Sequence, residues 1–99
     1  MTFKEYQKIS RKTATYPGVD KNFVYPTLGL AGESGEVAGK IKKIIRDNNG
    51  VADKKRKQEL TEDLGDVLWY LTQIATELGI SLDEIALLNV KKIQSRKNR

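Results

Sequence analysis

Turn-forming residues at three places divide this chain into four segments, each with the apolar spacing of an amphipathic helix. The breaks are Tyr16-Pro17-Gly18, Asp47-Asn-Asn-Gly50 and Gly79. Thr2-Phe-Lys-Glu5 and Ser81-Leu-Asp-Glu84 each resemble a capping box, which is typical of a helix N-terminus. Pro26 suits the first turn of the second helix. These signals predict four helices, at about residues 2–15, 26–46, 57–78 and 81–96, and no strand.

The length and the short loops predict a single domain over residues 1–99. We expect an all-α, four-helix bundle-like fold. A monomer of 99 residues has a thin core, so we expect oligomerisation to complete it. Helical wheels place the following apolar side chains in the predicted core: Leu30, Val37, Ile41 and Ile44; Leu60, Leu64, Val67, Leu71, Ile74, Ala75 and Leu78; Leu82, Ile85, Ala86 and Ile93.

Two acidic spacings lie beside these apolar stripes: Glu33-Ser-Gly-Glu36, and Glu62-Asp63-Leu-Gly-Asp66. Carboxylates three or four residues apart share one face of a helix. Two such faces turned toward each other form an all-oxygen site of the kind that Mg²⁺ or Mn²⁺ prefers. The alternative for the second spacing is a solvated acidic face near a helix N-terminus. That alternative is weaker for Asp66, which lies well beyond the first turn.

The composition excludes several kinds of catalytic and metal-binding sites. The chain has no cysteine and no histidine, which excludes thiolate metal sites, cysteine nucleophiles and histidine general bases. Its formal charge of +5 suits a polyanionic partner, either a nucleic acid or a phosphorylated metabolite. No apolar run approaches about 18 residues and no signal-peptide core is recognisable, so we expect a soluble cytoplasmic protein without a membrane partner.

Two further features indicate close contacts. Gly32, Gly35 and Gly39 fall inside the second predicted helix, where each glycine costs about 1 kcal/mol relative to alanine. They predict the close approach of another helix or a ligand, or else a close-packing face. Asn89 falls in the middle of the apolar stripe of the fourth helix, so we interpret it as a buried amide that bonds helix ends or a ligand. Lys92 and Arg96 flank that stripe, where they could reach phosphates.

Together these motifs resemble one family in their order and spacing. The stretches are Leu28-Gly-Leu-Ala-Gly-Glu-Ser-Gly-Glu-Val37, Glu62-Asp-Leu-Gly-Asp-Val-Leu-Trp-Tyr70, and Asn89-Val-Lys-Lys92 with Arg96. They look like the MazG-type nucleoside triphosphate pyrophosphohydrolases. The resemblance implies an all-α enzyme that hydrolyses a (d)NTP to the monophosphate and pyrophosphate. It also implies Mg²⁺ held by a Glu-x-x-Glu and a Glu-x-x-Asp pair, and a homodimer or homotetramer.

The resemblance assigns roles to particular acidic residues. Glu33, Glu36, Asp63 and Asp66 would be the metal ligands. Asp63 stands where the family has glutamate, and Glu62 precedes it, so the choice between these two as ligand stays open. Gly32 stands where some members carry an additional glutamate, so Glu62, or else another carboxylate of the site, would be the catalytic residue that orients the attacking water.

The remaining site residues concern the nucleotide. Asn89 and Lys92 match the family's Asn-x-x-Lys, and with Arg96 and Lys40 they are the predicted substrate-binding residues. The expected role is housecleaning or control of the nucleotide pool. Two alternatives are a phosphoribosyl-ATP pyrophosphohydrolase, whose surrounding motif differs, and a basic helical module that binds nucleic acid. The second is disfavoured because the basic residues are not interleaved with exposed aromatic residues.

Overall fold

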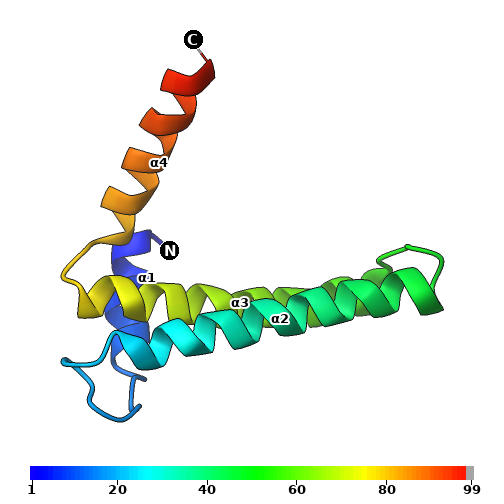
Figure 1. Cartoon of the computed structure of the whole chain (residues 1–99), viewed down its shortest axis with the longest axis horizontal. Coiled ribbons are helices and arrows are strands. Elements are labelled where there is room, and N and C mark those ends of the chain that lie inside the picture. The colour runs from blue at the N-terminus through cyan, green and yellow to red at the C-terminus, as the bar shows by residue number, and fades with distance from the viewer. Residues whose placement is uncertain (98–99) are drawn as a thin grey trace.

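A computed structural model describes residues 1–97, which form four helices and no strand. The helices are α1 (Phe3–Arg11), α2 (Val24–Asp47), α3 (Lys54–Glu77) and α4 (Leu82–Lys97). In Figure 1, α2 and α3 lie side by side as a long hairpin, α1 crosses the end of α3, and α4 points away from the hairpin. The prediction of an all-α fold is confirmed. No helix within residues 1–97 is long and apolar enough to span a membrane.

Local capping explains where α1, α3 and α4 begin. The predicted capping box at Thr2 and Glu5 is present, and the Ser81 hydroxyl accepts a hydrogen bond from the Glu84 N–H at 3.1 Å. Helix α3 begins three residues earlier than predicted. The reason is Asp53, whose carboxylate accepts a hydrogen bond from the Arg56 N–H and caps the helix. The basic run that starts at Lys54 is therefore helical and not a connecting segment.

The predicted end of the first helix at Thr15 is wrong, because α1 ends at Arg11. Beyond that point the backbone N–H groups of Thr13 and Ala14 donate to carbonyls only three residues back, which tightens the chain into a turn. The predicted stop at Gly79 is confirmed: its φ of +70° is left-handed, a conformation that glycine adopts at little cost.

The hairpin buries only part of the predicted apolar stripes. Ile44, Ala75 and Leu82 are buried as predicted, whereas Leu64 and Ile93 are exposed. A helix that packs on a single neighbour covers one side of its apolar stripe, and the rest of the stripe faces outward. A second copy that covers these side chains stays a prediction.

A buried carboxylate joins the N-terminal part of the chain to the end of α3. The side chain of Glu77 is only 1% exposed, and its oxygens accept hydrogen bonds from the Tyr16 hydroxyl, from Arg11 (2.8 Å), and from the backbone N–H groups of Asp20 and Asn22 (both 2.9 Å). Burial alone would raise the pKa of Glu77, but these bonds lower it to about 2. The network fixes the loop that leads into α2, and with it the position of α2 on α3.

Candidate active site

The middle of the hairpin carries an acidic cluster: Glu33 and Glu36 on α2, and Asp63 and Asp66 on α3. The pKa of Glu33 is raised by partial burial and by the negative charges of Glu36, Asp66 and Asp63. The antiparallel pairing of α2 and α3 therefore brings all four predicted metal ligands into one electrostatic neighbourhood. Carboxylates in such a group repel one another, so the group favours a cation.

A lysine supplies part of the positive charge that the acidic cluster favours. Lys40 Nζ lies 2.5 Å from Asp63 Oδ2, and the contact with Asp63 raises the pKa of Lys40. The side chain of Asp63 is 10% exposed, and within residues 1–97 its buried Oδ2 has this ion pair but no hydrogen-bond partner. Lys40, predicted as a substrate-binding residue, is thus placed at the edge of the acidic cluster as the counter-ion of Asp63.

The donor chemistry of the acidic cluster fits a hard divalent cation, because every donor is a carboxylate oxygen. In the part of the chain that is described, however, no three Asp or Glu side chains are close enough to hold a metal ion as they stand. Coordination by the cluster would therefore require new side-chain rotamers, including the release of Asp63 from Lys40.

Glu62, the predicted catalytic residue, is exposed on α3 next to Asp63. Asp63, by contrast, contacts Lys40 on α2 at 2.5 Å. Of these two neighbouring carboxylates, Asp63 is therefore the one that turns toward α2. Glu62 lies beside the acidic cluster and faces solvent.

The structure does not bring Asn89, Lys92 and Arg96 to the acidic cluster of their own chain. All three are exposed on α4, which points away from the hairpin (Figure 1). Only the start of α4 is buried: Leu82 is enclosed, and its N–H donates to the Gln7 side chain on α1 at 3.0 Å. The interpretation of Asn89 as a buried amide is wrong within residues 1–97, where Asn89 is exposed.

An aromatic group, which the sequence alone did not reveal as a cluster, borders the acidic cluster. The ring of Tyr16 stacks on Tyr25, with centroids 5.4 Å apart, and meets Trp69 edge-on. Trp69 in turn meets Tyr70 edge-on at 5.1 Å. The pKa of Tyr70 is raised by burial and by the charges of Tyr25, Glu33 and Asp66, so its hydroxyl end lies near the acids.

Within residues 1–97 the close approach to α2 occurs at Gly29, and the predicted approach of a helix at Gly32, Gly35 and Gly39 is not found; the approach of a ligand there stays a prediction. A Cβ atom on Gly29 would lie 2.2 Å from the ring of Tyr70, whereas a Cβ on Gly32, Gly35 or Gly39 would meet nothing within 4 Å in the described chain. Gly29 therefore allows the Tyr70 ring to lie against the backbone of α2.

This contrast predicts opposite effects for two glycine substitutions. Gly29→Ala should lower the free energy of unfolding by about 1–3 kcal/mol, because the Tyr70 ring must move. Gly32→Ala should raise it by up to about 1 kcal/mol through helix propensity. Urea unfolding of both variants, without metal or nucleotide, measures the difference. Equal stabilities would show that Tyr70 does not pack on Gly29.

Comparisons with known proteins identify the family of the chain. Residues 26–99 match the family model of the MazG nucleotide pyrophosphohydrolase domain. Gene 37 protein of Mycobacterium phage L5 is 42% identical over 99 aligned residues, which cover 95% of this chain and 87% of that protein. No solved structure matches the chain significantly. The family match spans both acidic spacings and Asn89-Val-Lys-Lys92, and the chain belongs to the MazG nucleotide pyrophosphohydrolase domain family.

Proposed function

We propose that the protein hydrolyses nucleoside triphosphates, with dNTPs as the expected substrates, to the monophosphate and pyrophosphate in a Mg²⁺-dependent reaction. The observation that carries this proposal is the acidic cluster, which α2 and α3 build from the two carboxylate pairs of a MazG-family chain. The proposed role is housecleaning or control of the nucleotide pool.

The four carboxylates of the acidic cluster would hold Mg²⁺, with Mn²⁺ as a substitute. When bound, the ion would neutralise phosphate charge and lower the pKa of water. Glu62 is the proposed general base: an exposed carboxylate next to Asp63 can accept a proton from the water that attacks the α-phosphorus. The bond between the α-phosphorus and the oxygen that bridges it to the β-phosphorus then breaks, and pyrophosphate leaves.

Asn89, Lys92 and Arg96 are the proposed substrate-binding residues, together with Lys40. Because α4 points away from its own hairpin (Figure 1), these three residues would act at the acidic cluster of another copy. A homodimer or homotetramer is therefore part of the proposal. The exposed apolar side chains of α4, among them Leu88 and Ile93, are suited to such a contact.

A panel of standard and modified NTPs and dNTPs, tested for pyrophosphate release with Mg²⁺, examines the proposal. We expect release from at least one dNTP and none after the divalent ion is chelated. Release of orthophosphate alone, or a rate that chelation leaves unchanged, would count against the proposal.

Substitutions at the two neighbouring carboxylates should separate their roles. Glu62→Gln should lower kcat by about 100-fold or more with little change in the Mg²⁺ concentration needed for half-maximal rate, as loss of a general base predicts. Asp63→Asn should instead raise that Mg²⁺ concentration, because it removes a ligand. A Mg²⁺ titration of the rate for both variants measures this. The reversed pattern would exchange the two assignments.

A further inference from the structure

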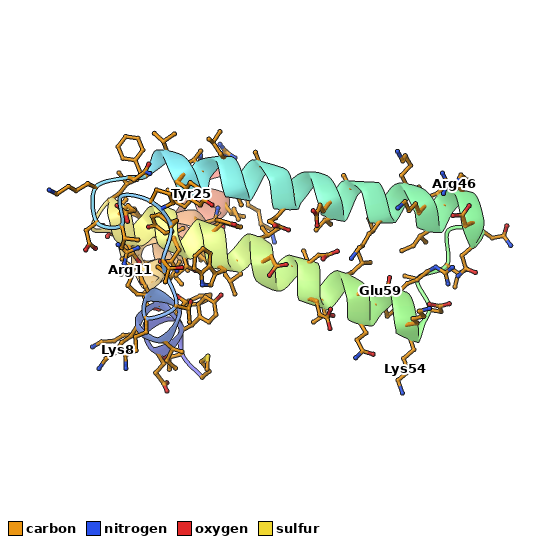
Figure 2. All side chains as sticks on the ribbon, turned by 90° about the horizontal axis from the view of Figure 1, so that it is seen from below. Lys8, Arg11, Tyr25, Arg46, Lys54 and Glu59 are labelled. Carbon is orange, nitrogen blue, oxygen red and sulfur yellow. The ribbon has the colours of Figure 1, made fainter. Side chains whose placement is uncertain are left out.

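A pocket of about 320 Å³ lies near the closed end of the hairpin, between the last turns of α2 and the first turns of α3. Its charged lining consists of Lys40, Lys43, Asp47, Lys55, Arg56 and Glu59. Figure 2 shows Glu59, Arg46 and Lys54 at this end of the hairpin, where the two ribbons spread apart, and Tyr25 and Arg11 at the other. We call the pocket with this lining the tip pocket.

The charges of the tip pocket favour an anion. Four of its lining residues are cationic and two are acidic. Two of the cations already have a carboxylate partner outside the lining: Arg56 pairs with Asp53 at 2.6 Å and Lys40 with Asp63 at 2.5 Å. Asp47 is already bonded to Arg46, outside the lining, at 2.7 Å and 2.9 Å, which lowers the pKa of Asp47. No ion pair within residues 1–97 involves Lys43 or Lys55. Two exposed ammonium groups, one from each helix, thus line the pocket without a carboxylate partner.

One residue links the tip pocket to the acidic cluster. Lys40 lines the pocket, and its Nζ also contacts Asp63. Along α2, Lys40 follows Glu36 by one turn and Lys43 lies about 10 Å beyond Glu36, from the helix rise of 1.5 Å per residue. The hairpin therefore presents, in order, the aromatic group with Tyr70, the acidic cluster, Lys40 and the tip pocket.

We propose that the tip pocket binds the β- and γ-phosphates of the substrate and the pyrophosphate that leaves. This inference rests on the proposed function, and it gives the nucleotide a direction along the hairpin. The α-phosphorus would lie at the acidic cluster and the base toward Tyr70. Lys40 would exchange its partner: with Asp63 serving as a metal ligand, the Lys40 ammonium would be free to bind a phosphate oxygen.

Inorganic pyrophosphate is the direct probe of this site. Binding is measured by titration calorimetry in Mg²⁺ buffer for the full chain and for two double variants. Lys43→Ala with Lys55→Ala removes two lining charges. The matched control, Lys42→Ala with Lys54→Ala, removes two exposed lysines next to them on the same helices that do not line the pocket.

The lining variant should bind pyrophosphate about tenfold more weakly or worse, because charge-assisted hydrogen bonds are lost. The control should change by less than about twofold, as expected for screened surface charges. The KM for the best dNTP should likewise rise more in the lining variant than in the control variant. Circular dichroism verifies that both variants are folded.

Three results would overturn the assignment of the tip pocket as the pyrophosphate site. These are equally weakened pyrophosphate binding in both variants, unchanged pyrophosphate binding in both, or binding of an oligonucleotide but not of pyrophosphate. The proposed function fails in a different way. If no dNTP yields pyrophosphate, yet the lining variant alone loses pyrophosphate binding, the anion site stands and the enzymatic assignment does not.

Discussion

Replacing Glu36 by glutamine, or Asp66 by asparagine, is expected to reduce pyrophosphate release from a dNTP by about 100-fold or more, the scale seen when a preorganised charge-stabilising group is lost. Each substitution keeps the shape of the side chain and removes one negative charge from the acidic cluster. Asp83→Asn, an exposed carboxylate near the start of α4, is the matched control and should retain the parent rate.

Stability separates loss of the site from loss of the fold in these variants. With divalent ions chelated, the melting temperatures of Glu36→Gln and Asp66→Asn should equal or exceed that of the parent chain, because each change relieves repulsion that raises the pKa of Glu33. Undiminished pyrophosphate release in both variants would contradict the metal-ligand assignment. Inactive variants with clearly lower melting temperatures would show that these carboxylates support the fold.

Removing the carboxylate of Glu77 is expected to lower the free energy of unfolding by about 1–3 kcal/mol, the usual cost of leaving buried hydrogen-bond donors without an acceptor. Glu77→Ala leaves the Tyr16 hydroxyl and two backbone N–H groups without this acceptor, whereas Arg11 keeps its ion pair with Asp20 at 2.7 Å. Denaturant unfolding measures the loss. Glu84→Gln, at an exposed glutamate, is the control and should change stability by no more than about 0.5 kcal/mol.

The same carboxylate should make stability depend on pH in a defined window. The pKa of Glu77 is about 2 in the folded chain, against an ordinary value of 4.5. A lowered pKa means that the unfolded chain binds the proton more readily, so the contribution of Glu77 is complete above about pH 5 and is lost as the pH falls toward 2. Glu77→Gln should flatten this part of the stability curve. An unchanged slope would show that Glu77 is not held as a buried anion.

Features set by local sequence could be predicted. The four helices follow from apolar spacing and from caps such as Thr2 and Ser81, which act within one turn. The grouping of Glu33, Glu36, Asp63 and Asp66 also follows, since an antiparallel hairpin brings the middles of two consecutive helices together. A helical period together with a short connection is enough to predict such a site.

Features that depend on distant partners could not be predicted in this way. Glu77 is a single glutamate whose hydrogen-bond donors lie 55 to 66 residues earlier in the chain. A helical wheel places Asn89 on an apolar face, but it does not show whether another helix covers that face. Similarly, propensity marked Gly32, Gly35 and Gly39 as costly, whereas only the packing of Tyr70 reveals that Gly29 is the glycine with no room for a side chain.

The most direct test of the central claim is to identify which phosphorus water attacks. A dNTP is hydrolysed in ¹⁸O-labelled water with Mg²⁺, and the products are analysed by mass spectrometry. Attack at the α-phosphorus predicts dNMP that carries one ¹⁸O and pyrophosphate that carries none. Label in the pyrophosphate, or products consisting of dNDP and orthophosphate, would contradict it.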